Sequence, residues 1–152
     1  MFLHQLTPAQ RRVFCRLAQH LIGLDQVVDI REEAALESSL REMGLRPAEL
    51  PPGPRALDEV LPELAVLDTL ESRRVLVLEL ALVVCADRSV ELAEVPGVPL
   101  LLERLDVEEE LLPRLQAFAR DHHLLVERGK ALISPDWDQS GEGWIDEDED
   151  EG

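Results

Sequence analysis

The stretch SRRVLVLELALVVCADRSVELAE, residues 72–94, decides the fold of this chain. Within it, residues 75–86 are apolar except for Glu79, which makes them the most apolar window of the protein. A helix that is apolar on every side is normally buried in the middle of a domain. The window is too short to span a bilayer, which takes about 20 apolar residues. Because its valines would also suit a buried strand, the window alone leaves helix and strand open.

A second copy of this pattern lies sixty-two residues earlier in the chain. Arg11-Arg12-Val13 corresponds to Arg73-Arg74-Val75, and each triplet is followed by a mainly apolar stretch that ends in an aspartate. Beyond these aspartates, the first copy reads D-x-x-V-D-x-x-E from Asp25 and the second reads D-x-x-V-E-x-x-E from Asp87. An internal repeat of this kind constrains the architecture, so the two copies are expected to fold alike.

The first copy carries the signals of a helix start. Thr7 is a good N-cap, Pro8 suits the first helical position and Gln10 completes a capping box. By analogy the central copy is predicted to be a helix too, with Asp68 and Glu71 as its capping box. The chain is then a two-fold pseudo-repeat of helix, acidic turn and helix.

Periodicity and helix breakers place the remaining elements. We expect helices at about 8–24, 30–43, 56–67 and 107–122, another from about residue 98, and a short apolar segment at 124–133 that closes the core. Asp106 with Glu109 is predicted to cap the helix from 107, and His122-His123 to lie at its C-terminal end. Strand-forming runs are scarce and tyrosine is absent. These features predict an all-α protein, a compact helical bundle of about six to eight helices.

The negative charge is unevenly placed along the chain. Of the net −17, nine acids and no Lys or Arg fall in residues 135–152, which leaves 23 acids against 15 bases in residues 1–134. We therefore divide the chain into a helical domain, 1–134, and an acidic C-terminal tail, 135–152, whose composition is that of a disordered segment. So acidic a surface repels phosphate backbones, which argues against nucleic-acid binding.

The N-terminal segment and the two cysteines indicate the cellular compartment of the protein. The start MFLHQLTPAQRR holds no signal-peptide core and no transmembrane segment follows it, so we expect a cytoplasmic protein without membrane insertion. Cys15 and Cys85 lie in apolar helical stretches without a C-x-x-C partner. They are predicted to be buried free thiols, which fit a reducing compartment.

Six carboxylates recur at matched positions of the two acidic turns. They are Asp25, Asp29, Glu32, Asp87, Glu91 and Glu94. Acids in the first turn of a helix are stabilised by its dipole, which accounts for the later members of each set. The leading aspartates are different, because each is predicted at the C-terminal end of a helix, where its charge opposes the dipole. Either each aspartate caps the following helix, or three carboxylates converge on a cation such as Ca²⁺, Mg²⁺ or Zn²⁺. The spacing is not that of an EF-hand, whose sixth position is glycine.

An apolar helix followed by AD-x-x-V-E-x-x-E, twice in an all-α chain of this length, resembles the TerB-like family, named for a tellurite-resistance protein. The N-terminal domain of DjlA-type co-chaperones shares the pattern. The resemblance covers about residues 8–133 and is strongest over 67–94, LDTLESRRVLVLELALVVCADRSVELAE. Gln26 and Arg88 stand where family members usually have glycine. The resemblance implies a compact helical bundle, metal binding through the acidic motifs and a stress-related assembly role, without an established enzymatic activity.

The chain contains no G-x-S-x-G, Gly-rich phosphate loop, H-E-x-x-H or C-x-x-C motif. Glu79 is the buried polar candidate: in an apolar helix its carboxylate either pairs with a base, such as an arginine from another helix, or belongs to a functional site. A metal-activated water held by carboxylates is the one enzymatic route left open. It would need Glu79 and the motif acids to line one pocket.

The acidic tail contains Trp137 and the pair Trp144-Ile145, which a purely solubilising segment does not need. Either the tail is simply solvated, or these residues dock into a basic, hydrophobic groove on a partner or on this protein. Three functions stay open. The favoured one is a non-enzymatic helical module for protein interaction in a stress-response setting, with a divalent cation bound by the acidic turns. The alternatives are a metal-dependent hydrolase of unknown substrate and a structural scaffold without metal.

Overall fold

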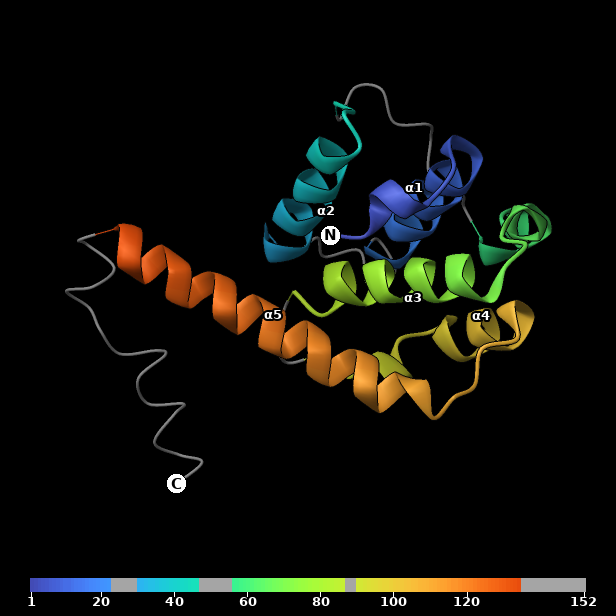
Figure 1. Ribbon diagram of the computed structural model, residues 1–152. Helices are drawn as coiled ribbons and strands as arrows, with labels where there is room; N and C mark the ends of the chain where they lie inside the picture. The colour runs from blue at the N-terminus through green and yellow to red at the C-terminus, as the bar shows by residue number, and fades with distance from the viewer. Residues whose placement is uncertain (23–29, 47–55, 87–89, 135–152) are drawn as a thin grey trace.

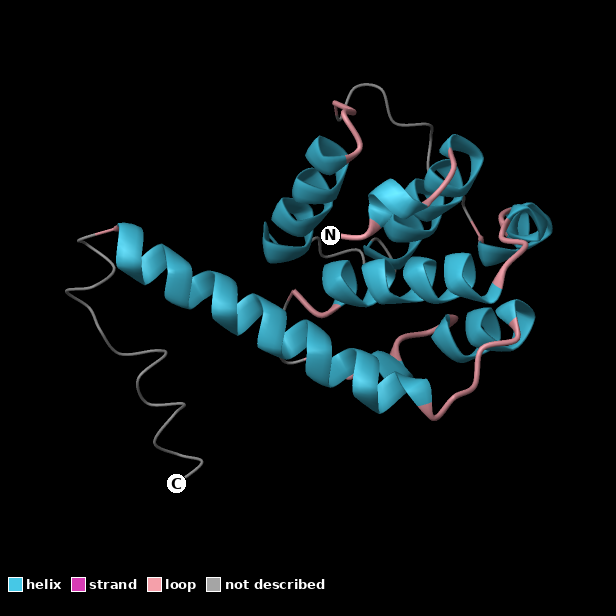
Figure 2. Ribbon diagram, in the orientation of Figure 1, coloured by secondary structure: helices cyan, strands magenta, loops and turns pink. Residues whose placement is uncertain are grey.

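The computed structural model describes residues 1–22, 30–46, 56–86 and 90–134, with the side chains of 30–33 left aside. The described part is mostly helical and contains no strand (Figures 1 and 2), so the prediction of an all-α bundle is confirmed. The described residues form the α-helices α1 Pro8–Ile22, α2 Ile30–Glu42, α3 Leu70–Val84, α4 Val98–Leu105 and α5 Leu111–Ile133. They also form the short 3-10 helices η1 Leu3–Gln5, η3 Leu57–Glu59, η4 Leu61–Val66 and η5 Leu92–Glu94.

The apolar helix α3 lies at the centre of the bundle. Helices α1 and α2 pack on one side of it and α5 crosses the other side (Figure 1). Nearly every residue of α3 from Leu76 to Val84 is buried, because neighbours cover it on all sides. Fully burying a Leu or Val side chain contributes about 1.5–3 kcal/mol, so this helix supplies a large share of the hydrophobic stabilisation. The prediction of a buried central helix over this stretch is confirmed.

The start of α1 follows the predicted capping box, whereas that of α3 is shifted by one residue. The Thr7 N–H donates to Gln10 Oε1 at 2.9 Å and the Gln10 N–H donates to Thr7 Oγ1 at 3.2 Å. At α3 the prediction of Asp68 and Glu71 as the capping box was wrong. Thr69 is the N-cap, and its Oγ1 accepts the Ser72 N–H at 3.0 Å.

The region 106–133 differs most from the predicted elements. Asp106 does not open a helix but ends α4, in the left-handed region at φ 57°. The next helix starts at Leu111 and runs without a break to Ile133. Pro113 lies in its first turn, where a backbone donor has no helical partner to lose. The segment 124–133 therefore does not close the core but forms the second half of α5, and several of its apolar side chains are exposed.

Two glycines lie at helix boundaries, as expected for residues that interrupt helices. Gly44 ends α2 with a positive φ of 74°, and α4 begins at Val98 directly after Gly97, which has φ 91°. The predicted helix over 56–67 is replaced by two 3-10 helices, η3 and η4, and Pro62 lies in the first turn of the second. Cys15 and Cys85 are buried thiols, as predicted. No helix in the described ranges is long and apolar enough to cross a membrane.

Candidate functional site

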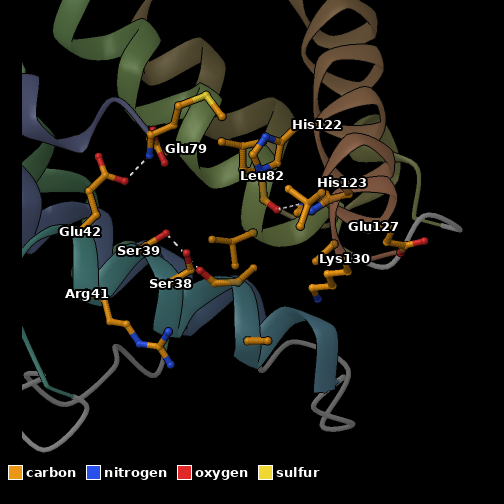
Figure 3. A pocket seen from close by; sticks show the side chains of 16 residues that line it. Ser38, Ser39, Arg41, Glu42, Glu79, Leu82, His122, His123, Glu127 and Lys130 are labelled. Atoms are coloured by element: carbon orange, nitrogen blue, oxygen red, sulfur yellow. Dashed lines mark hydrogen bonds and ion pairs between the residues drawn. The ribbon is translucent and has the colours of Figure 1, made fainter. Parts of the chain in front are cut away.

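A cleft of about 920 Å³ opens between α2, α3 and the second half of α5 (Figure 3). Its floor is formed by Leu82 and Val83 of the C-terminal part of α3 and by Ala86, two residues beyond the helix. This volume falls in the range of known ligand pockets, about 300–1,000 Å³. The cleft exists because α2 and α5 both pack on α3 but are not paired with each other along this stretch.

The wall formed by α2 is built from small side chains. Ala34, Ala35, Ser38 and Ser39 face the cleft at the i, i+4 spacing of one helical face. The Ser39 hydroxyl donates to the Ala35 carbonyl oxygen at 3.2 Å, so its hydrogen bond is made within the helix. Small side chains let another backbone approach closely. This wall therefore leaves room for a bound molecule but contributes few polar groups to binding.

One end of the cleft is closed by two glutamates and the N-terminal ammonium group. Glu79, only 1% exposed, accepts the Phe2 N–H at 2.5 Å and lies 3.2 Å from the Met1 ammonium nitrogen. Glu42 forms an ion pair with the same ammonium and accepts the Leu3 N–H at 3.0 Å. A buried carboxylate requires such compensation. Glu79 thus has the cationic partner that we expected, and this partner is the ammonium group rather than an arginine.

The wall formed by α5 carries two histidines beside Val126. The prediction that His122 and His123 end a helix was wrong, because α5 continues for ten more residues to Ile133. His123 Nε2 lies 2.6 Å from the Leu82 carbonyl oxygen. Since a carbonyl oxygen only accepts, Nε2 carries the proton and ties α5 to α3. Burial lowers the pKa of His122 from 6.5, and the neighbouring His123 and the N-terminal ammonium lower it further, so its ring is neutral at pH 7.

The predicted metal ligands lie mostly beyond the described residues. Asp25, Asp29 and Asp87 fall outside them, as does the side chain of Glu32. Glu91 and Glu94 are described and exposed, and neither lines the cleft. Glu91 Oε1 lies 3.4 Å from the Arg120 guanidinium. Within the described residues no three His, Cys, Asp or Glu side chains are grouped to hold a metal. The cation site stays a prediction.

The hydrolase alternative needs Glu79 and the motif acids in one pocket. Glu79 lines the cleft, but its carboxylate already binds the N-terminal ammonium and a backbone N–H. The two motif acids whose side chains are described lie elsewhere. The described geometry thus supplies no carboxylate set of the kind that this alternative requires.

Two buried glutamines make backbone contacts that the sequence reasoning missed. The Gln116 side chain accepts the Leu92 N–H at 2.8 Å and donates to the Val90 carbonyl oxygen at 2.7 Å. It fixes the second half of the second acidic segment against α5. Gln10 similarly donates to the Val66 carbonyl oxygen at 2.9 Å. The available signal was a glutamine on the apolar face of a helix, where an amide needs backbone partners.

Comparisons with known proteins do not identify a family for this chain. No protein-family model, no curated protein and no solved structure matches the chain. The TerB-like resemblance therefore remains an expectation that rests on the acidic motifs alone. The tail residues Trp137, Trp144 and Ile145 lie outside the described part of the chain.

Proposed function

We propose that this chain is a non-enzymatic interaction module, and that its cleft binds an amphipathic helix of a partner protein. The observation that carries the proposal is the open cleft between α2 and α5, which has an apolar floor and a wall of small side chains. Helix-in-groove recognition uses such a surface, because the apolar face of the incoming helix replaces water on the floor. A stress-response setting rests on the TerB-like resemblance only.

The state of the polar groups supports binding rather than catalysis. Glu79 is held by the ammonium group and His123 by the Leu82 carbonyl oxygen, so both act as structural contacts. Burial lowers the pKa of the neighbouring His122, which favours its neutral form. A partner would then meet apolar side chains on the floor, with the charged side chains of Arg41, Glu127 and Lys130 on the two walls.

The charge of the protein indicates the charge of the partner. At a net −17, the chain attracts cationic segments and repels anionic ones at a distance. The bound helix is therefore expected to combine Leu or Ala on its apolar face with Lys or Arg on the other. Such electrostatic attraction speeds association more than it adds affinity.

The proposal is tested with a neutral apolar dye, N-phenylnaphthylamine, whose fluorescence rises in apolar surroundings. We expect the full chain to bind about one dye in the cleft. A basic amphipathic helical peptide should displace it, and a peptide of scrambled sequence should not. The dye reports on the surface without a known partner.

The matched variants are Ser38→Phe and Glu37→Phe, which place the same bulky side chain at adjacent positions of α2. Ser38 lines the cleft, whereas the Glu37 side chain is 57% exposed and lies outside it. We expect dye and peptide binding to fall at least tenfold in Ser38→Phe and to persist in Glu37→Phe. Equal binding by both variants would show that the cleft is not the binding surface.

A divalent cation bound by the acidic turns is a second proposal, favoured by one observation. Ala34, near the start of α2, and Ala86, directly before Asp87, line the same cleft. The described flanks of the two acidic segments therefore lie close in space. On this proposal carboxylates of the two segments share one cation, because they are the hard oxygen donors that Ca²⁺ or Mg²⁺ requires.

The cation is tested by thermal unfolding of chelator-treated protein with and without Ca²⁺, Mg²⁺ or Zn²⁺. A cation at 100 times its dissociation constant adds about 2.7 kcal/mol to the stability. We expect this shift to disappear in Asp25→Asn and Asp87→Asn and to remain in Asp148→Asn, since Asp148 belongs to the acidic tail. A shift that all three variants retain would assign the effect to nonspecific binding.

A further inference from the structure

The second half of α5 carries an exposed apolar stripe. Phe118, Leu125 and Leu132 follow one another at intervals of seven residues, and Ile133 lies beside the last of them. Their exposed fractions are 39%, 66%, 90% and 82%. A seven-residue spacing keeps side chains on one face of a helix. We call these four residues the α5 stripe. Single exposed apolar residues are ordinary, but several that recur every second turn of one helix indicate a docking surface, although Asp121 and Arg128 lie between them.

The charge of α5 differs from that of the rest of the chain. The helix has four bases, Arg114, Arg120, Arg128 and Lys130, against two acids, Asp121 and Glu127. Residues 1–110 carry 21 acids and 11 bases, and the tail carries nine acids and no base. The tail is therefore repelled by most of the protein and attracted by the helix that directly precedes it.

We propose that the acidic tail, 135–152, folds back and docks on the α5 stripe of its own chain. The apolar side chains of the tail, Trp137 and Trp144-Ile145, would cover the stripe. Its carboxylates would lie beside Arg114 and Arg128, because Lys130 lines the cleft and Arg120 contacts Glu91. This inference does not depend on the proposed function of the cleft. It concerns a different face of α5, centred on Leu125 rather than on His123.

The length of the tail fits this arrangement. Pro135 follows Ser134, the C-cap of α5, and a proline does not favour continuation of the helix, so a turn there would bring the tail back beside Leu132 and Ile133. From Trp137 to Trp144, seven extended residues span about 23 Å. From Leu132 back to Phe118, fourteen helical residues span about 21 Å. Trp137 would then lie over Leu132, and Trp144 over Phe118.

Tethering makes this contact far easier than one between molecules. A short flexible connection gives the tail an effective concentration in the millimolar range at α5. Weak individual contacts therefore suffice for docking. The main competitor is a second copy of the protein, whose own α5 stripe could pack antiparallel on this one.

Tryptophan fluorescence of the full chain tests the proposal directly. The chain has two tryptophans, both in the tail, and no tyrosine. Its emission therefore reports on the tail alone. We expect emission at shorter wavelength, and less quenching by acrylamide, than for the free peptide 135–152. Emission identical to that of the free peptide would overturn the proposal.

Single-tryptophan chains test the register. Trp137→Phe leaves Trp144 as the reporter, and adding Phe118→Glu should return its emission to that of the free peptide. Trp144→Phe leaves Trp137 as the reporter, and adding Leu132→Glu should have the same effect. The control is Leu70→Glu, which places the same charge on a 48% exposed leucine at the start of α3. An unchanged emission after both α5 substitutions would refute docking on the stripe.

Dilution distinguishes the tail's own helix from a second copy. We expect the blue-shifted emission to be unchanged over a hundredfold dilution and the chain to sediment as a monomer. Emission that shifts back to that of the peptide on dilution would assign the contact to another molecule and overturn docking within one chain. Helical circular dichroism of each variant confirms that the fold is kept.

Discussion

A carboxylate enclosed by leucines and valines keeps its charge only if a cation accompanies it. At Glu79 that cation is the N-terminal ammonium, which Glu42 also contacts. The segment before α1 is thereby attached to the centre of the bundle, because Phe2 and Leu3 donate their N–H groups to the same two carboxylates. The one carboxylate in the apolar stretch of α3, Glu79, therefore has a structural role.

Glu79→Gln is expected to lower the free energy of unfolding by about 1–3 kcal/mol, the range for a hydrogen bond to a charged group. The amide can still accept the Phe2 N–H, but the ammonium loses its buried counter-charge. Urea unfolding followed by circular dichroism measures the change. Glu71→Gln, on the exposed start of the same helix, should cost less than about 1 kcal/mol. Equal effects at the two positions would contradict a structural role for the buried pair.

Cys15 gives a pH-dependent prediction. Burial raises the pKa of its thiol from 9.0 to about 11. In the unfolded chain the thiol ionises at lower pH than in the folded one, so stability is complete below pH 9 and falls as the pH rises towards 11. We expect a loss on the order of 1–2 kcal/mol over this interval. The chain has one lysine and no tyrosine, so few other groups titrate there.

The measurement is the urea midpoint at intervals between pH 8.5 and pH 11, for the parent chain and for Cys15→Ala. The variant is less stable at every pH, because it leaves a small cavity, but the slope against pH should be shallower than in the parent. Parallel slopes for the two chains would show that the Cys15 thiol does not cause the alkaline loss.

At the scale of elements, the helices whose starts and ends are encoded locally were predictable from the sequence. Thr7 with Gln10 marks the start of α1, and Gly44 marks the end of α2. The length of α5 was not predictable in this way, because no glycine or proline follows His123 until Gly129 and Pro135. The left-handed conformation of Asp106 also depends on packing, since Val107, one residue later, is buried.

Two glycines should respond in opposite directions to the same substitution. Gly129 lies inside α5, and a Cβ atom there would meet nothing within 4 Å, so Gly129→Ala should stabilise the protein by about 0.5–1 kcal/mol. Gly97 has φ +91° and its Cβ would lie 3.2 Å from Leu57 Cδ2. Gly97→Ala should therefore destabilise the protein by about 1–2 kcal/mol. Chemical denaturation of both variants measures the pair. A stabilising Gly97→Ala would contradict the described turn before α4.

At the scale of the whole molecule, the cleft could not be derived from the sequence. Its lining comes from three segments far apart in the chain, in α2, α3 and α5, and no motif links them. Their meeting depends on how α2 and α5 pack against α3. The acidic repeat, by contrast, is visible in the sequence. It indicates only which segments to compare, because the positions of Asp25 and Asp87 lie outside the described residues.

Net charge acts on the whole molecule, and its effect on stability has a definite sign. Raising the salt concentration from about 0.01 M to 0.1 M shortens the Debye length from about 30 Å to about 10 Å, which weakens repulsion among like charges. The same salt weakens surface ion pairs such as Arg74–Glu108 and Arg120–Glu91, each worth at most about 1 kcal/mol. With a net −17, we expect repulsion to dominate, so salt should raise the urea midpoint.

A chain that ends at Ser134 provides the control for this salt dependence. It keeps every buried residue of the described core but carries 23 acids against 15 bases, a net −8. Because self-repulsion grows with the square of the net charge, its response to salt should be about fourfold smaller. The folding signal is the circular dichroism of the helices, which is separate from the tryptophan emission of the tail. A midpoint that falls with salt in both chains would mean that surface ion pairs, rather than like-charge repulsion, govern the stability of this acidic bundle.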